Sequence, residues 1–329
     1  MARGLPLDKA TMGGQEAVGQ GGPVKHWMRS RGWDKTAVRA NVAPLTVQGD
    51  RMNRDTVFPV AIGGVGGSGT RVVATFLRML DYFLGDDLNE AMDNIWFTLL
   101  FKRRSILVES ESDFRSLVSL FFSRMSGTTT LSEAERTRIF LLAGQERLQH
   151  PREWLIERAY SFCNGKTSKR PGQPWCWKEP NTHILIDRIF TFHPDLRYIH
   201  VVRHPLGMAV GNNQNQLQNW GPVFLNRDVA IEPRLSLSYW CAAHRRIMEF
   251  VRSWPERTMM IEFDALCAVP DPHCAKIVKF LDTELRDDVV ADFRKFVRRP
   301  DATRRVSSTE LAQYDPTDLA YVAELGYAL

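Results

Sequence analysis

The 329-residue chain is long enough to bury a full core as one large domain or as two small ones. Its hydrophobic content of 44% and charged content of 25% are ordinary for a globular protein, and no run approaches the roughly 18 apolar residues of a membrane span. The net charge of +5 permits an anionic partner but selects none. Five cysteines without a CxxC pair argue against a disulfide framework or a zinc ribbon and predict reduced, buried thiols.

Residues 1–55 are polar, rich in glycine, lysine and arginine, and without sustained hydrophobic periodicity. We expect a poorly ordered or loosely packed N-terminal arm there, followed by one α/β domain over residues 56–329. No apolar segment follows the early arginine, so the N-terminus does not resemble a secretion signal. These features predict a soluble, cytoplasmic protein.

A glycine-rich segment joins the first predicted strand to the first predicted helix. The apolar run at 57–62 ends in glycines, as a buried parallel strand does where it enters a turn. Beyond Arg71 the apolar residues recur at helical spacing as far as Gly85, where we expect the helix to end. Such a turn presents backbone N–H groups to an anion, and the helix dipole favours negative charge at the same place.

The spacing of Gly64 and Gly69 matches the front of a nucleotide-binding P-loop, but the residues that follow do not. Enzymes that use ATP or GTP continue with lysine and then serine or threonine, which reach the outer phosphates and magnesium. This chain has Thr70 and Arg71 instead. The loop therefore favours a single 5′-phosphate, with a P-loop kinase or NTPase as an alternative.

The later elements alternate between strands and helices. Short apolar runs predict strands at 197–202 and 258–263, and Ser132 with Glu135 predicts a capping box. Helical periodicity marks three longer segments: 109–124, 132–149 and 235–254. Strands separated by helices indicate a P-loop-type parallel sheet flanked by helices in a single large α/β domain.

Four segments, in this order, resemble motifs of the sulfotransferase superfamily, in the style of its bacterial and glycan or heparan-type members. They are Gly67-Ser68-Gly69-Thr70, Trp177-Lys178-Glu179-Pro180, Arg203-His204-Pro205 and residues 260–266. The resemblance spans about residues 57–329 and implies the sulfotransferase fold, with a helical acceptor-binding insertion near residues 86–170. It also implies transfer of a sulfuryl group from 3′-phosphoadenosine 5′-phosphosulfate to a hydroxyl or amine, leaving adenosine 3′,5′-bisphosphate, without a metal.

The resemblance assigns two phosphate sites. Arg203 would bind the 3′-phosphate, and Arg304 or Arg305, from the basic run at 294–305, would close over it. Gly211 stands where the family usually has serine, so Asn212, or its neighbour Asn213, would donate instead. The 5′-phosphate would lie on the loop residues Gly66, Gly67, Ser68, Gly69, Thr70 and Arg71.

The reacting groups are assigned in the same way. Glu90 lies closest to the family's position for a carboxylate base, and Asp93 is the second candidate. Because glycine at 67 replaces the usual basic residue, Lys178 would supply that charge at the bridging oxygen, oriented by an ion pair with Glu179.

Several alternatives remain open at the level of sequence. The glycines at 67 and 211 are compatible with a catalytically idle relative that binds a nucleotide or a polyanion. A nucleic-acid binder would rest on charge alone, since aromatic and basic residues do not interleave, so we expect no nucleic-acid partner. The acceptor would be a small molecule or a glycan, with a carbohydrate or glycolipid favoured.

Overall fold

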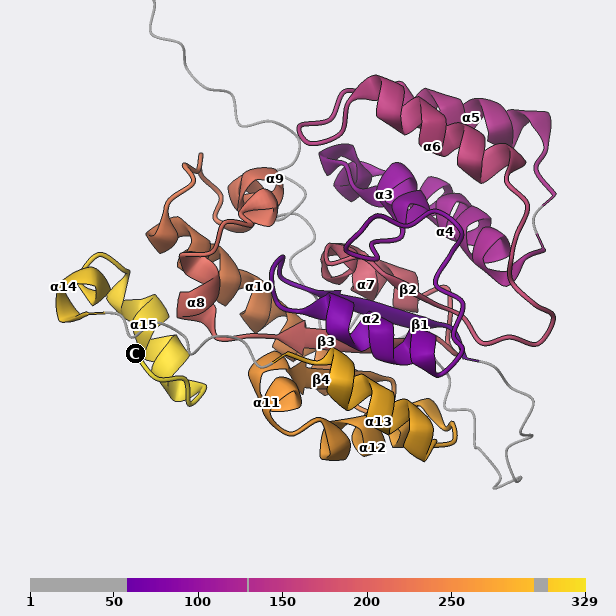
Figure 1. Ribbon diagram of the computed structural model, residues 1–329. Coiled ribbons are helices and arrows are strands. Elements are labelled where there is room, and N and C mark those ends of the chain that lie inside the picture. Colours follow the sequence, from indigo (N-terminus) through magenta and orange to yellow (C-terminus); the bar gives the residue numbers. More distant parts are fainter. Residues whose placement is uncertain (1–57, 129, 299–306) are drawn as a thin grey trace, which may run out of the picture. The chain divides into compact units, whose positions relative to one another are not determined.

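The computed structural model describes residues 58–128, 130–298 and 307–329 (Figure 1). The predicted arm at 1–55 lies outside these residues, as do Arg304 and Arg305.

A four-stranded parallel sheet organises the described residues (Figure 1). The strand order is β2-β1-β3-β4, with β1 at Val60–Gly64, β2 at Cys176–Lys178, β3 at Arg197–Val202 and β4 at Thr258–Glu262. Because every pair is parallel, the carboxyl ends of all four strands meet at one edge, where ligands bind in open α/β sheets. The predicted fold class, a parallel sheet flanked by helices, is confirmed.

Alternate residues of the strands face two different helical layers. Ile62, Val201 and Ile261 pack into one core cluster with residues of α2 (Thr70–Met79), α12 (Pro270–Leu281) and α13 (Asp287–Phe296). On the opposite face, Tyr198 of β3 contacts Phe250 of α10 (Pro233–Ser253), and Phe250 in turn contacts Phe190 of α7 (Thr182–Phe190). The sheet is therefore buried on both faces, which explains why its strands are continuous apolar runs.

The chain between β1 and β2 contributes a layer of four helices. They are α3 (Ile95–Phe101), α4 (Glu111–Ser126), α5 (Glu133–Ala143) and α6 (Arg152–Asn164). Phe97, Phe121 and Trp177 lie in ring contact, so aromatic packing attaches this layer to β2. The remaining helical segments are η1 (Arg104–Val108), α8 (Pro205–Ala209), α9 (Asn215–Phe224), α11 (Phe263–Ala268), α14 (Ser308–Leu311) and α15 (Pro316–Glu324).

Two predicted helix ends are wrong. Helix α2 ends at Met79 and not at Gly85, because Asp81 adopts a left-handed φ of 70° and Phe83 then pairs with Trp175 as extended chain. Helix α5 ends at Ala143 and not at 149, because the guanidinium of Arg147 turns back to carbonyls of α3. The capping box of α5 is confirmed.

Two expectations from composition can be compared with the structure. All five cysteines are buried and free, as predicted. Over the described ranges, no helix is both long and apolar enough to cross a membrane.

Buried neutral histidines make the fold sensitive to acid. Burial lowers the pKa of His183 to about 3 and that of His200 well below its usual value. Below about pH 6.5 the unfolded chain therefore binds more protons than the folded protein does. The folded protein is thus most stable at neutral pH and loses stability as the pH falls. We expect the free energy of unfolding to drop by about 2 kcal/mol for each of the two imidazoles between pH 7 and pH 5. Urea midpoints measured at both pH values test this, and an unchanged midpoint would contradict it.

Candidate functional site

The glycine loop between β1 and α2 leaves the start of the helix open. Gly67 and Gly69 both adopt left-handed backbone conformations, with φ of 92° and 91°. Gly69 is the N-cap of α2 and, having no side chain, cannot cap the first turn. The N–H group of Val72 bonds to the Gly69 carbonyl at 2.9 Å, and the N–H groups of Thr70 and Arg71, together with the positive end of the helix dipole, are left to an external anion.

Phe263, directly after β4, fixes one end of this loop. A Cβ atom added at Gly69 would lie 2.1 Å from Cδ2 of the Phe263 ring, so the ring occupies the space that a side chain would need. A Cβ at Gly67 would meet nothing within 4 Å. The Phe263 ring therefore packs closely against the loop at Gly69, whereas the space beside Gly67 is empty.

The serine and threonine of the loop are buried, whereas the arginine is exposed. Ser68 and Thr70 are 1% and 5% exposed, and Arg71 lies at the surface. The Oγ atom of Ser68 is buried without a hydrogen-bond partner among the residues described. An unpaired buried hydroxyl costs about 1–3 kcal/mol, a cost that a hydrogen bond to a bound anion would remove.

Arg203, at the end of β3, lies beside the loop. Its Nη1 atom is 3.5 Å from the carbonyl oxygen of Gly67, and its guanidinium carbon is 5.1 Å from the centre of the Phe263 ring. One carboxylate oxygen of Asp264 is 3.7 Å from Nε of Arg203, and the other accepts a 3.4 Å hydrogen bond from the backbone N–H of His204. Two consecutive residues after β4 therefore position Arg203 against the glycine loop.

The two asparagines after α8 differ in their position. Asn213 lies against the loop, since a Cβ at Gly66 would be 3.5 Å from its side-chain amide. Asn212 is exposed. Of the two amides that the sequence suggested, the structure thus places Asn213 at the glycine loop.

Lys178 is a buried cation at the carboxyl end of β2. Its Nζ atom donates to the carbonyl of Ala91 at 3.0 Å and bonds to one carboxylate oxygen of Asp93. Asn89 donates to the other oxygen of Asp93 at 2.9 Å. Glu90 is exposed and, within the described part of the chain, makes no hydrogen bond or ion pair. Asp93, and not Glu90, is the acid that meets Lys178.

Glu179 belongs to a neighbouring network, so the expected ion pair between Glu179 and Lys178 is wrong. Its carboxylate accepts hydrogen bonds from the backbone and side-chain nitrogens of Asn181, at 2.6 and 2.8 Å, and lies 3.8 Å from Nζ of Lys102. Burial raises the pKa of Glu179, opposed mainly by the nearby charge of Lys102. The reason for the different partner is that Asp93, which is distant in sequence, reaches Lys178.

Two residues at this edge were missed by the sequence reading, Lys102 and His150. Lys102 follows α3 directly, and His150 lies between α5 and α6, stacked on Trp154 with ring centres 4.9 Å apart. Burial lowers the pKa of His150 to about 4, with further lowering from Lys102 and Arg147 and an opposing effect of Asp93. Neither residue belongs to a sequence motif, so only their three-dimensional neighbours identify them.

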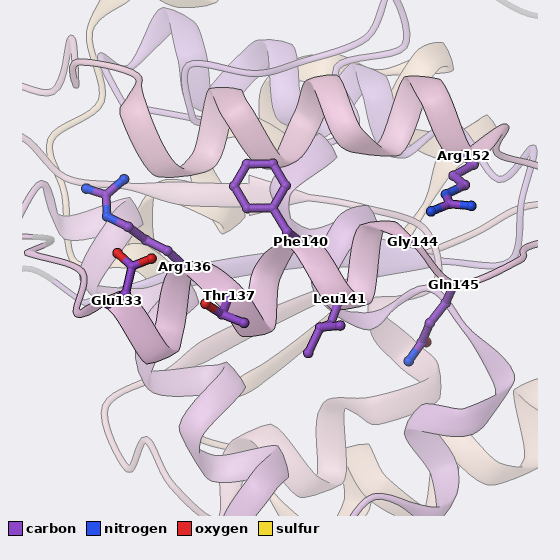
Figure 2. Close-up of a pocket in the computed structure, with 8 residues that line it drawn as sticks. All are labelled: Glu133, Arg136, Thr137, Phe140, Leu141, Gly144, Gln145 and Arg152. Atoms are coloured by element: carbon purple, nitrogen blue, oxygen red, sulfur yellow. The ribbon is translucent and has the colours of Figure 1, made fainter.

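A hollow of about 600 Å³ lies elsewhere, on α5 and the segment that follows it (Figure 2). Figure 2 shows Glu133 and Arg136 at one end of its lining and Arg152 at the other. Phe140 points toward the adjacent helix α6, where it contacts Tyr160. No lining residue comes from the glycine loop or the strand ends, so this hollow is separate from the site.

The contact between Gly69 and Phe263 leads to a prediction about stability that compares two variants. Gly69→Ala adds a methyl group that collides with Phe263, whereas Gly67→Ala adds one to open space at nearly the same φ. We expect the control, Gly67→Ala, to lose only the left-handed strain of about 1–2 kcal/mol, and Gly69→Ala to lose at least twice as much. Urea unfolding of both variants measures this, and equal losses would show that Phe263 does not constrain the loop.

Comparisons with known proteins bear on the family of the chain. Residues 59–288 match the model of the sulfotransferase family. Similar solved structures include sulfotransferase STF9 from Mycobacterium avium, with 15% identity, a TM-score of 0.44 and coverage of 92% of this chain and 80% of that one. The sulfotransferase domain of the Synechococcus PCC 7002 olefin synthase has 17% identity, a TM-score of 0.41 and coverage of 86% and 99%. A search of curated proteins finds no match. The family match covers more than half of this chain, and the chain therefore belongs to the sulfotransferase family.

Proposed function

We propose that this sulfotransferase transfers the sulfuryl group of 3′-phosphoadenosine 5′-phosphosulfate to a hydroxyl or amine of a small-molecule or glycan acceptor. The observation that carries the proposal is the pairing of two anion-binding features at one sheet edge, the uncapped start of α2 and Arg203, whose Nη1 lies 3.5 Å from the Gly67 carbonyl. A donor with a phosphate at each end of its ribose needs two such features. A nucleotide with one phosphate chain needs only the first.

Each phosphate would have its own set of groups. The 5′-phosphate would accept hydrogen bonds from backbone N–H groups between Gly66 and Arg71. It would also accept one from the hydroxyl of Ser68, which has no partner among the described residues. The 3′-phosphate would pair with the half-buried guanidinium of Arg203, which Asp264 holds in place. Asn213, its neighbour Asn212, and Arg304 or Arg305 remain proposals for further donors.

Lys178 fits the role of stabilising the leaving group. A buried ammonium that is already fixed by Asp93 and the Ala91 carbonyl needs no reorganisation when negative charge develops on the oxygen between phosphorus and sulfur. Both carboxylate oxygens of Asp93 are engaged, by Lys178 and Asn89, so its place in the site supports a positioning role. The ordered Lys178–Asp93 pair favours an active enzyme over an idle relative.

The helical layer from α3 to α6 supports the proposed acceptor-binding insertion near residues 86–170. It is attached to β2, and the chain on either side of α3 supplies Asp93 and Lys102 to the strand edge. An acceptor approaching from this layer would meet Lys178 opposite the nucleotide loop. The cytoplasmic location, the absence of a metal and the preference for a carbohydrate or glycolipid remain predictions.

Calorimetric titration with adenosine 3′,5′-bisphosphate tests the donor site. We expect micromolar binding, weakened about 10- to 100-fold by Arg203→Ala, because charged hydrogen bonds contribute about 1.5–3 kcal/mol. Binding of adenosine 5′-monophosphate, which lacks the 3′-phosphate, should change little. Arg234→Ala removes an exposed arginine on α10 and serves as the control. Tighter binding of ATP with magnesium, or no loss in Arg203→Ala, would contradict the proposal.

The role of Lys178 calls for a different measurement. Lys178→Met keeps the volume of the buried stem and removes the charge, so we expect the release of adenosine 3′,5′-bisphosphate from the sulfated donor to fall about 100-fold or more. Because the bisphosphate carries the full charge that Lys178 would stabilise, its affinity should fall as well, so the rate is measured with the donor in saturating excess. Lys276→Met, at an exposed lysine on α12, is the control. Turnover equal to that of the wild type would exclude Lys178 from the reaction.

A further inference from the structure

Gln216, in the first turn of α9, bonds to the last residue of β1. Its side-chain Nε2 atom donates to the Gly64 carbonyl at 3.1 Å, and the residue is only 4% exposed. Gly64 is the point at which the chain leaves the sheet and enters the glycine loop. A buried side chain that is distant in sequence therefore holds the start of the loop.

The neighbours of Gln216 allow its amide only one satisfactory orientation. Its Oε1 atom accepts from the Tyr239 hydroxyl and pairs with Nε2 of His183, both at 3.1 Å. A rotated amide would set Oε1 against the Gly64 carbonyl, which can only accept hydrogen bonds. His183 is completely buried, and burial lowers its pKa to about 3, so its neutral ring donates from Nε2 to the amide oxygen. The amide nitrogen is therefore directed at Gly64.

Helix α9 is itself held by two other parts of the chain. Gln149, in the segment between α5 and α6, accepts a hydrogen bond from the side chain of Asn219 at 2.7 Å. The indole N–H of Trp220 donates to the side chain of Asn181, which follows β2, also at 2.7 Å. Because the helix is bonded both to the helical layer and to the segment after β2, it gives the Gln216 amide a fixed position.

The glycine loop is thus held at both of its ends. Phe263 packs against Gly69, where the loop enters α2, and Gln216 bonds to Gly64, where the loop leaves β1. The space beside Gly67, between these two contacts, is empty. Ordering a loop when a ligand binds costs free energy, so a loop that is already ordered binds more tightly. The two contacts together arrange the backbone N–H groups before an anion arrives.

We propose that Gln216 is a positioning residue of the donor site, which fixes the start of the glycine loop and so sets the affinity of the loop for the 5′-phosphate. This inference rests on the proposed function, which assigns the 5′-phosphate to the loop. Because the amide is buried, it acts through the Gly64 carbonyl and not by contact with the donor. Arg203 is assigned to the 3′-phosphate, so the two residues should affect opposite ends of the same ligand.

Titration with three adenine nucleotides separates this role from a general loss of structure. Gln216→Met keeps the length of the side chain and removes the N–H donor. We expect it to weaken binding of adenosine 3′,5′-bisphosphate and of adenosine 5′-monophosphate by the same factor, about 5- to 10-fold. Adenosine 3′-monophosphate, which has no 5′-phosphate, should bind as it does to the wild type. Unchanged affinity for the 5′-monophosphate, or an equal loss for all three nucleotides, would overturn the proposal.

Two further variants complete the test. Thr258→Val, at the start of β4 and so at the opposite edge of the sheet, removes a 2.7 Å hydrogen bond from a buried hydroxyl to the Trp254 carbonyl. It should lower the urea midpoint and leave all three affinities unchanged, and weaker binding of the 5′-monophosphate there would attribute the effect to lost stability.

Gln216→Asn has an amide that is one methylene too short to reach Gly64, so it should reproduce the pattern of Gln216→Met even if that variant does not fold. Affinity for the 5′-monophosphate equal to that of the wild type would contradict the proposal. If the wild type itself does not bind the bisphosphate, the proposed function fails first. If the wild type and the Gln216 variants bind it equally well, only the role of Gln216 fails.

Discussion

The packing of the Phe263 ring against Gly69 is the contact on which the phosphate-binding edge depends. The ring takes the space in which any side chain at 69 would lie, so this residue must be glycine, and its left-handed backbone turns the chain into α2 with the helix start uncapped. The same ring lies 5.1 Å from the guanidinium of Arg203. One aromatic residue after β4 therefore positions both features that we assign to the two phosphates of the donor.

The charges at this edge are arranged in pairs that leave specific atoms available. Lys178 is compensated by Asp93, and Glu179 by Lys102 and Asn181. Buried ions persist only when they are paired and hydrogen-bonded, and a fixed charge in such surroundings acts more strongly than one in water. By contrast with these paired groups, the buried hydroxyl of Ser68 in the glycine loop has no hydrogen-bond partner among the described residues.

The parts of the fold that could be predicted from sequence are those with a local signal. The bounds of β3 were predicted correctly, because a mainly apolar run of six residues is followed by Arg203-His204-Pro205. The strand β2 was not predicted, because three residues are too few for a periodic pattern. The loss of helix after Met79 depends on Phe83 pairing with Trp175, which lies more than ninety residues away and leaves no local trace.

The candidate site likewise contains parts that could be predicted from sequence and parts that could not. The glycine loop and Arg203 follow strands, so their meeting at one edge could be predicted from a parallel sheet. The carboxylate that pairs with Lys178 could not be predicted from sequence, because the pairing depends on how the chain turns between α2 and α3. His150 carries no motif and lies on a connection whose course is set by the hydrogen bonds of Arg147 and Gln149.

The most direct measurement of the central claim is a crystal structure with adenosine 3′,5′-bisphosphate bound. The account predicts 5′-phosphate oxygens within hydrogen-bond distance of backbone N–H groups between Gly66 and Arg71, and the 3′-phosphate paired with Arg203. A nucleotide bound elsewhere, or with its 3′-phosphate in solvent, would contradict the assignment of this edge as the donor site.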